Sequence, residues 1–229
     1  MKLSDVRALV TGGSSGIGKE IARQLVARGG KVVICGRDAS KLQTAAAETG
    51  AIALPADVSV EREAVALVSE TITCLGGYNV LVNNAGFGSF AKLVDTSLDE
   101  MQRVFATNVF GAMVVGRESA RWFVKQQRGN IINVSSSAGR RGFAGGTAYA
   151  ASKFALTGMT ECWRGELRKA NVRVMQIDPS EVQTEFFRGR PFSDRKLRSE
   201  EIALAALAML EMDDRGFITD LAVWATNPD

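Results

Sequence analysis

The sequence of 229 residues contains no histidine. This absence excludes Ser-His-Asp and Cys-His catalytic triads, and it excludes zinc sites built on imidazole ligands. Cysteine is also scarce: Cys35, Cys74 and Cys162 lie far apart and form no CxxC pair. Their number and spacing favour neither a disulfide framework nor a cysteine metal site, so we predict no bound metal. Cys35 and Cys162 lie in apolar runs, where we expect buried, unreactive thiols. Any proton transfer must therefore use Tyr, Lys, Asp, Glu or Cys side chains.

Long hydrophobic runs and a strong charge imbalance are missing as well. The longest apolar run is IALAALAML at residues 202–210, which is too short to span a bilayer. The N-terminus, MKLSDVRALVTGG, lacks the apolar stretch of a signal peptide. The net charge of +3 is too small to indicate nucleic-acid binding. We therefore expect a cytoplasmic protein that binds neither a membrane nor nucleic acid.

Short apolar runs alternate along the chain with amphipathic stretches, a pattern typical of a parallel sheet that is covered on both faces. We predict an α/β, doubly wound fold: a mostly parallel, seven-stranded Rossmann-type sheet with helices on both faces, in a single domain spanning residues 1–229. The expected strands lie at 6–12, 31–36, 51–58, 79–86, 130–136, 172–178 and 217–225. The expected helices lie at 19–29, 38–50, 60–74, 97–128, 149–170 and 200–212, with an inserted substrate loop at about 185–201. Asp38, Ser59 and Ser97 are the expected N-caps of the helices that follow them.

A glycine-rich turn, TGGSSGIGKE at residues 11–20, joins the first strand to the first helix. Glycines in such a turn let the backbone approach a pyrophosphate that lies on the helix N-terminus. Residues 13–19 also fit the GxxxxGK part of an ATPase P-loop, but Glu20 follows instead of the serine or threonine that holds magnesium. A tight turn without a ligand is the third interpretation. Dinucleotide binding is favoured because the ends of the next three strands agree with it.

The first of these strand ends bears on the choice of cofactor. The second strand ends at Gly36, where dinucleotide folds place an acidic residue for the adenosine 2′-hydroxyl, and Arg37 follows. Arg37 can pair with a 2′-phosphate, which favours NADP(H), although a solvated arginine is the alternative. Asp57, at the end of the third strand, is an expected acceptor for the adenine amino group. In NNAG, residues 83–86, the last two residues allow close approach to a flat ligand, whereas Asn83 fits a structural role at least as well.

Tyr149 and Lys153 stand four residues apart in AYAASKFA, residues 148–155, so they share one face of the predicted helix. The same face continues with Leu156 and Trp163 and otherwise looks core-facing. A buried lysine is costly unless its charge is used. An ordinary packing pair is the alternative, but the lack of histidine strengthens the hypothesis that the tyrosine hydroxyl has a chemical role.

Taken together, three motifs in order resemble the short-chain dehydrogenase/reductase family over essentially the whole chain. TGGSSGIG matches the family's TGxxxGxG, NNAG matches outright, and YAASK matches YxxxK, with Ser136 standing 13 residues before the tyrosine. The resemblance implies an NADP(H)-dependent oxidoreductase with a catalytic tetrad of Asn108, Ser136, Tyr149 and Lys153. Together with the strand-end features, it implies these cofactor-binding residues: Gly12, Ser14, Ser15, Gly16, Ile17, Gly18, Arg37, Asp57, Val58, Asn84, Ala85, Gly86, Tyr149, Lys153, Pro179, Val182 and Thr184.

Electrostatic interactions give the four residues of the expected tetrad plausible chemical roles. A carbonyl oxygen that gains negative charge must take up a proton; Tyr149 is the expected donor, and Ser136 is expected to bond the substrate oxygen. An ammonium about 4 Å from a phenol supplies ~4 kcal/mol at an effective dielectric of 20, so Lys153 is expected to lower the tyrosine pKa by up to ~3 pH units. By resemblance, Asn108, in the middle of its long predicted helix, helps to hold a water-mediated proton path to the lysine. Ser135 is the alternative to Ser136.

The chain departs from the family pattern after the sixth strand, where Ser180 in DPSEVQT stands in place of the family's glycine and puts the loop conformation in question. The loop that follows suits either an acidic carrier, such as an acyl-carrier protein or a coenzyme A thioester, or a solvated lid over any small carbonyl. Phe143 is expected either in the pocket or in the core. The aromatic and basic residues of the loop are Phe186, Phe187, Phe192, Arg188, Arg190, Arg195, Lys196 and Arg198.

These observations favour a reductase of a ketone or a 3-oxoacyl thioester. A non-catalytic NADP-binding regulatory protein of the same fold is the alternative, and the P-loop hydrolase is a third. The family resemblance also implies a homodimer or homotetramer, joined through the predicted helices at 99–127 and 149–170.

Overall fold

The strands that the structure describes form one parallel sheet. A computed structural model describes residues 1–184, 193 and 195–226. The strands are β1 (Arg7–Thr11), β2 (Lys31–Gly36), β3 (Ile52–Pro55), β4 (Val80–Asn83), β5 (Gly129–Val134), β6 (Val172–Pro179) and β7 (Asp220–Val223). Their order is β3-β2-β1-β4-β5-β6-β7, and every neighbouring pair is parallel. The strand order changes direction between β1 and β4, which is where open α/β sheets bind ligands at the carboxyl ends of their strands.

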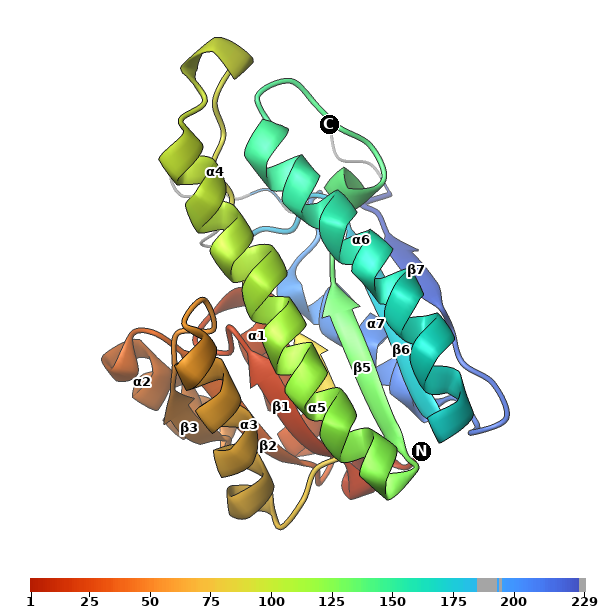
Figure 1. Ribbon diagram of the computed structural model, residues 1–229. Coiled ribbons are helices and arrows are strands. Elements are labelled where there is room, and N and C mark those ends of the chain that lie inside the picture. Colours follow the sequence, from red (N-terminus) through yellow and green to blue (C-terminus); the bar gives the residue numbers. More distant parts are fainter. Residues whose placement is uncertain (185–192, 194, 227–229) are drawn as a thin grey trace.

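Helices connect the strands and cover both faces of the sheet (Figure 1). The α-helices are α1 (Gly16–Ala27), α2 (Ala39–Thr49), α3 (Glu61–Leu75), α4 (Leu98–Phe105), α5 (Ala112–Gln126), α6 (Thr147–Leu167) and α7 (Ser199–Glu211). Shorter helical turns are η1 (Leu3–Asp5), η2 (Leu93–Asp95), η4 (Ser137–Gly139) and η5 (Arg168–Ala170), and η3 (Ala106–Gly111) is a π-helical turn. The predicted doubly wound fold is confirmed, and the sheet proves wholly parallel.

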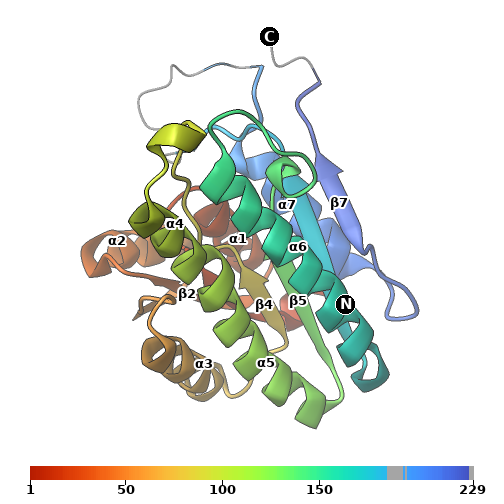
Figure 2. The same cartoon turned by 45° about the horizontal axis from the view of Figure 1, so that its top comes forward.

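Two hydrophobic cores lie on opposite faces of the sheet, because successive side chains of a strand point to opposite sides. In β1, Val10 packs into the core that α1, α2 and α7 cover, whereas Leu9 packs into the core that α3, α5 and α6 cover. In β6, Ile177 and Val174 divide between the two cores in the same way. Figure 2 turns the carboxyl edge of the sheet toward the reader and shows the beginnings of α4 and α6 beside it.

Helix starts follow the predicted caps at two positions and depart from them at a third. The Asp38 carboxylate accepts a hydrogen bond from the Lys41 amide at the start of α2, and the Ser97 hydroxyl accepts one at the start of α4, both at 3.0 Å. The prediction for Ser59 is wrong, because Val60 is the N-cap of α3. The Ser59 hydroxyl instead bonds the Asp57 carboxylate at 2.7 Å.

The long helix predicted at 97–128 is interrupted. Its apolar periodicity is continuous, but η3 separates α4 from α5 by a π-helical turn that contains Asn108. Such turns insert one residue into the helical ladder and are frequent at functional sites. The turn shifts the side chains that follow it relative to those of α4, a shift that hydrophobic spacing alone does not reveal.

Some predictions about exposure are also corrected. Cys35 is buried, but Cys162 is exposed, because it lies on the side of α6 opposite Leu156 and Thr160, which are buried.

In the proposed loop 185–201, residues 185–192 and 194 lie outside the described residues, and they include Phe186, Phe187, Phe192, Arg188 and Arg190. No described helix is long and apolar enough to cross a membrane.

Candidate active site

The turn between β1 and α1 leaves no room for a side chain at two of its glycines. A Cβ atom on Gly12 would lie 2.9 Å from Ala85 Cα, and one on Gly18 would lie 2.6 Å from the Gly12 carbonyl oxygen. Gly12 also has a φ of +65°, which favours glycine. The Asn84 amide closes the turn from the side of β4 by donating to the carbonyl oxygens of Thr11 at 2.9 Å and Gly12 at 3.2 Å. The glycines are thus required by the close packing of the turn against Asn84 and Ala85, and a turn of this kind before a helix is typical of dinucleotide-binding folds.

The N-terminus of α1 meets the segment that follows β6. Gly16 has a φ of +54°, and a Cβ there would lie 3.2 Å from the methyl group of Thr184. Ser15 is the N-cap of α1, and Ile17 is partly buried against the core. Val182 is buried and forms an isolated β-bridge with Leu197, shortly before α7. The structure therefore brings the predicted phosphate turn close to Thr184, another of the predicted cofactor-binding residues.

The P-loop interpretation finds no support in the side chains of α1. Lys19, which a P-loop would direct at phosphates, forms an ion pair with Glu48 of α2. Glu20 accepts hydrogen bonds from Arg23 and Gln24, each at 2.8 Å. Both side chains of the would-be P-loop are engaged with neighbouring helix residues rather than with the turn.

Arg37 stands where the second and third strands end. Its side chain is 64% exposed, and Nη1 lies 4.0 Å from Asp57 Oδ2. The other Asp57 oxygen is occupied by the Ser59 amide and hydroxyl, at 2.9 and 2.7 Å. A Cβ on Gly36 would lie 3.2 Å from Ser14 Oγ, so an acidic side chain has little room there. An anion at this point would meet an exposed guanidinium and a serine hydroxyl.

The residues at the end of β4 face two different surroundings. Asn83 is buried and donates to Asn133 Oδ1 at 3.1 Å and to the Ala112 carbonyl at 3.2 Å, so its role is structural. Gly86 faces the other side. A Cβ there would lie 3.7 Å from Lys153 Nζ. The backbone of NNAG therefore runs directly past the lysine that the YxxxK motif supplies.

Lys153 and Tyr149 face each other at this edge of the sheet. Lys153 Nζ lies 5.8 Å from the centroid of the Tyr149 ring and donates to the Val134 carbonyl oxygen at 2.9 Å. Lys153 is only 5% exposed. Burial lowers the pKa of its ammonium to about 8, and the Asp178 carboxylate acts in the opposite direction. At neutral pH the site therefore holds a buried cation beside an aromatic hydroxyl, and a ring face within ~6 Å attracts such a cation.

The expected lowering of the Tyr149 pKa is not found. Burial raises the pKa of the phenol, and hydrogen bonding to Ser136, which favours the ionised form, only partly offsets that rise. The expectation assumed an ammonium about 4 Å from the hydroxyl. Instead, Nζ lies against the ring and is held by the last carbonyl of β5. Loss of hydration is therefore the larger effect on the phenol.

Ser136, rather than Ser135, is the serine that contacts Tyr149. Ser136 Oγ accepts a hydrogen bond from the Ala138 amide at 3.1 Å and is hydrogen-bonded to the tyrosine side chain. Ser135 Oγ lies 3.3 Å from Thr157 Oγ1 and 3.4 Å from the Lys153 carbonyl oxygen. The fallback serine is thus occupied with the backbone and side chains of α6.

Asn108 holds the loop after β4 against α6. Its Oδ1 accepts from the Phe87 amide and its Nδ2 donates to the Phe87 carbonyl and to Ser152 Oγ, each at 3.0 Å. The π-helical turn also brings Gly111 against Val58, where a Cβ would lie 2.8 Å from the Val58 carbonyl oxygen. Val58 is buried here, so its side chain contributes to packing.

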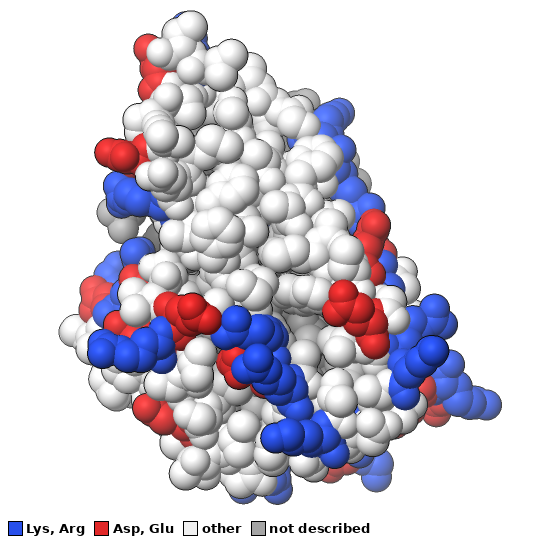
Figure 3. Space-filling view, viewed as in Figure 1, with Lys and Arg blue, Asp and Glu red and all other residues white. Residues whose placement is uncertain are grey.

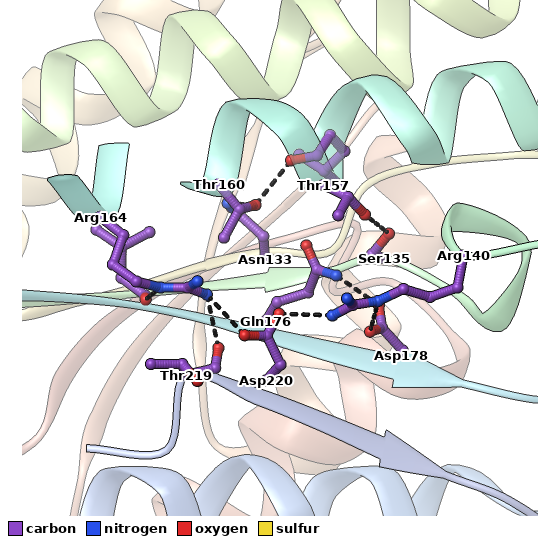
Figure 4. A network of polar contacts seen from close by, with 12 residues as sticks. Asn133, Ser135, Arg140, Thr157, Thr160, Arg164, Gln176, Asp178, Thr219 and Asp220 are labelled. Atoms are coloured by element: carbon purple, nitrogen blue, oxygen red, sulfur yellow. Dashed lines mark hydrogen bonds and ion pairs between the residues drawn. The ribbon is translucent and has the colours of Figure 1, made fainter. Parts of the chain in front are cut away.

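An ion-pair network that the sequence interpretation missed is centred on the buried Asp178 (Figure 4). Arg140, just after η4, donates to Asp178 Oδ2 at 3.0 Å and to Asp220 Oδ1 at 2.6 Å. Gln176 donates to the other Asp178 oxygen at 2.7 Å, and Arg164 pairs with Asp220 at 3.2 Å. Burial raises the pKa of Asp178, while Arg140 lowers it. The sequence signal for this network was Asp178, a carboxylate at the end of the predicted strand VRVMQID. Its partner Arg140 is too distant in sequence to be identified from spacing.

The substitution of serine for glycine after β6 is accommodated without strain. Ser180 does not have a positive φ, and its amide donates to the Val223 carbonyl of β7 at 2.9 Å. Pro179 ends β6 directly before it. The position therefore does not require the conformational freedom of glycine, and the doubt about this loop is removed for residues 180–184.

Two further aromatic residues approach Tyr149. The Phe90 ring lies edge-on to the Tyr149 ring with 5.6 Å between centroids, and the Phe143 ring lies 6.0 Å from Phe90. Phe143 is 50% exposed, so the core alternative for this residue is wrong. Phe90, at 44% exposure, was missed because no spacing rule connects it with the tyrosine.

Comparison with known proteins places this geometry in context. The family model described as short chain dehydrogenase matches residues 7–192. The chain belongs to the short-chain dehydrogenase family. An uncharacterised oxidoreductase of Staphylococcus aureus is 31% identical over 96% of this chain and 97% of its own. The 3-oxoacyl-[acyl-carrier-protein] reductase of Bos taurus is 35% identical over 77% of this chain and 75% of its own.

Solved structures agree with this membership. The 3-ketoacyl-(acyl-carrier-protein) reductase from Brucella melitensis, complexed with NADH, superposes with a TM-score of 0.92 and 27% identity over 99% of this chain and all of its own. A closed form of serine dehydrogenase complexed with NADP⁺ superposes with a TM-score of 0.87 and 26% identity over 94% of this chain and 93% of its own. The chain is therefore an oxidoreductase of this family with a nicotinamide cofactor, and the relatives leave the choice between NAD and NADP open.

Proposed function

We propose that this short-chain dehydrogenase is an NADP(H)-dependent enzyme that interconverts a carbonyl compound, a ketone or a 3-oxoacyl thioester, and the corresponding alcohol. The observation that carries the proposal is the buried Lys153 ammonium, 5.8 Å from the centroid of the Tyr149 ring, at the sheet edge beside Gly86. Such a cation is costly in a purely structural site. It is useful where a neighbouring hydroxyl must give up a proton.

The residues divide the work between binding and proton transfer. When bound, a nicotinamide cofactor supplies the hydride. Tyr149 donates the proton to the substrate oxygen in the reductive direction, and Ser136 hydrogen-bonds the same oxygen as negative charge develops on it. Lys153 stabilises the tyrosinate that remains. Asn108 is a positioning residue, since its side-chain bonds hold the Phe87 loop and Ser152.

The glycine turn and the strand ends fit the rest of the cofactor. Gly12 and Gly18 let the turn pack closely against Asn84 and Ala85, and the N-terminus of α1 that follows is the proposed site for a pyrophosphate. Arg37 supports NADP(H) because its guanidinium is exposed and its Nη1 lies 4.0 Å from the Asp57 oxygen, beyond normal hydrogen-bond distance. Ser14, beside Gly36, offers a second donor to a 2′-phosphate. The other proposed cofactor contacts are Ser15, Gly16, Ile17, Val58, Asn84, Ala85, Pro179, Val182 and Thr184.

The decisive experiment is oxidation of NADPH at 340 nm with a panel of simple ketones, aryl ketones and 3-oxoacyl thioesters. Turnover of any of them supports the proposal. Tight NADPH binding without turnover of the panel would favour the alternative, a regulatory protein of the same fold.

We also propose a homodimer or homotetramer in which α5 and α6 contact a second copy. Figure 3 shows that the middle and upper part of the face formed by α4, α5 and α6 carries few charges. Two large apolar side chains on this face are about half exposed, Phe110 at 56% and Phe154 at 47%. Sedimentation velocity tests the assembly. A species with the chain mass of 24.5 kDa at micromolar concentration would contradict it.

A further inference from the structure

A row of aromatic rings leads from the reactive hydroxyl toward solvent. Tyr149 and Phe90 meet edge to face at 5.6 Å between centroids, and Phe90 and Phe143 follow at 6.0 Å. Aromatic pairs at such separations attract each other through their ring quadrupoles. The row is therefore continuous, and it begins at the atom that exchanges a proton with substrate in the proposed function.

The backbone fixes the two phenylalanines in place. The Ala91 amide donates to the Gly145 carbonyl at 3.0 Å, and Ala91 forms a bridge with Gly146. A Cβ on Gly146 would lie 2.6 Å from the Phe143 ring, so the ring packs directly on this glycine at the start of α6. The segments that carry the rings come from opposite sides of the site, one after β4 and one after β5.

The two phenylalanines of this row are apolar and partly exposed. Phe90 is 44% exposed and Phe143 is 50% exposed, and the same segment continues with Leu93 and Val94 at 77% and 88%. Removal of apolar surface from water favours binding, so a hydrocarbon group that covers these half-exposed rings would gain affinity. Ring faces offer a ligand no hydrogen-bond donor or carboxylate-binding group. They suit hydrocarbon, whereas a polar substituent would lose hydration without gaining a partner.

We propose that Phe90 and Phe143 form the subsite for an apolar substituent on the carbonyl substrate, an aryl group or a bulky alkyl chain. The inference rests on the proposed function, since it needs the carbonyl to lie at Tyr149. The substituent packs on the two rings while the carbonyl oxygen meets the tyrosine hydroxyl. The same hydrocarbon chemistry is found in an aryl ketone and in the acyl chain of a long 3-oxoacyl thioester, so the test includes both sources.

The test compares kcat/KM for matched pairs of substrates that differ in the apolar substituent. Acetophenone is paired with 2-butanone, and 3-oxodecanoyl coenzyme A with acetoacetyl coenzyme A. For at least one pair, we expect the wild-type enzyme to prefer the larger member. In Phe90→Ala and Phe143→Ala, that preference should fall by ~10-fold, the range that a lost hydrophobic contact gives in enzyme pockets. Phe90→Leu, which keeps an apolar side chain, should recover part of it.

A matched control separates this loss from general damage. Leu204→Ala removes a 52% exposed apolar side chain from α7, on the opposite face of the sheet, and should leave both preferences unchanged. Melting temperatures of all variants, measured in parallel, show whether the alanine variants are folded; if one is not, its leucine variant takes its place. Unchanged preferences in folded variants at both phenylalanine positions would overturn the inference.

Failure of the proposed function has a different signature. If no carbonyl in any assay is turned over, calorimetric titration of 1-phenylethanol into the wild-type protein with NADP⁺ replaces the kinetic readout. Binding that Phe90→Ala weakens would support the apolar subsite in a protein without turnover. Binding that is absent, or equal in the two proteins, would overturn the subsite as well.

Discussion

Replacing Lys153 with methionine tests what the buried ammonium costs the fold. Methionine keeps most of the apolar stem and removes the charge. In the structure, burial lowers the pKa of this ammonium to about 8 from its ordinary value of 10.5. Because the pKa is lower in the folded chain, the unfolded chain holds this proton more tightly, and the wild-type protein gains stability as the pH rises from about 8 to about 10.5.

The magnitude follows from that difference and from one hydrogen bond. At 1.36 kcal/mol for each pH unit, the charged lysine costs the folded protein about 3 kcal/mol at pH 7. The variant also loses the bond from Nζ to the Val134 carbonyl, at 2.9 Å, whose loss costs about 1–2 kcal/mol. Lys153→Met should therefore be more stable than wild type by ~1–2 kcal/mol at pH 7 and less stable by a similar amount near pH 10.5.

Urea unfolding of the variant and the wild type at both pH values is the assay, since other groups that titrate at high pH cancel in the difference. Lys125→Met, at an exposed position near the end of α5, is the control and should show no reversal of sign. A Lys153→Met protein that is less stable than wild type by the same amount at both pH values would refute the reasoning. The cation would then carry no desolvation cost, and the argument that its position is functional would lose its basis.

Three other substitutions test separate parts of the site. Arg37→Ala should weaken NADPH binding by ~10–100-fold, as loss of a charge-assisted hydrogen bond predicts, and NADH binding far less; equal weakening in fluorescence titrations would remove the basis for preferring NADP(H). Gly18→Ala places a methyl group 2.5 Å from the Asn84 amide nitrogen and should cost about 1–3 kcal/mol in urea unfolding, whereas Gly158→Ala, with nothing within 4 Å in an exposed turn of α6, should not destabilise the protein. Asp178→Asn removes the carboxylate that raises the pKa of the lysine ammonium, so the alkaline limb of the kcat/KM profile should move to lower pH; an unmoved limb would exclude this coupling.

The fold is readable from the sequence because its strands are buried on both faces. Residues 32–35 of β2 and 80–82 of β4 are buried and appear in the sequence as the continuous apolar runs VVIC and VLV. Caps at Asp38 and Ser97 act within a few residues, so local sequence is sufficient to place them. Ser59 failed as a cap because a competing acceptor, Asp57, lies two residues earlier. Local competition of this kind changes which residue is the cap without changing the helix.

The proposed catalytic group is also largely local, so its geometry could be predicted from the sequence. Tyr149 and Lys153 share one helix, so their separation in space follows from helical geometry. Ser136 was placed by its spacing to the tyrosine, and the structure puts it within hydrogen-bonding reach of that side chain. The direction of the tyrosine pKa was not predictable in this way, because it depends on burial that the complete fold determines.

The remaining features depend on contacts between distant segments. The π-helical turn at Asn108 leaves the apolar pattern of its helix intact, so periodicity did not reveal it. Arg140 and Asp178 form an ion pair although they lie 38 positions apart. Phe90, which follows β4, contacts Tyr149 in α6, which follows β5. Spacing rules describe neighbours on one element, and each of these contacts forms between elements.

The most direct test of the account is the turnover of Tyr149→Phe, measured as NADPH oxidation with the best substrate from the panel, together with NADPH affinity. Removal of the hydroxyl alone should lower kcat by ~10²–10⁴-fold, the range for a lost general acid, while the dissociation constant of NADPH stays within about threefold. A variant that retains wild-type turnover would contradict the central claim that this hydroxyl, beside the buried ammonium, supplies the proton.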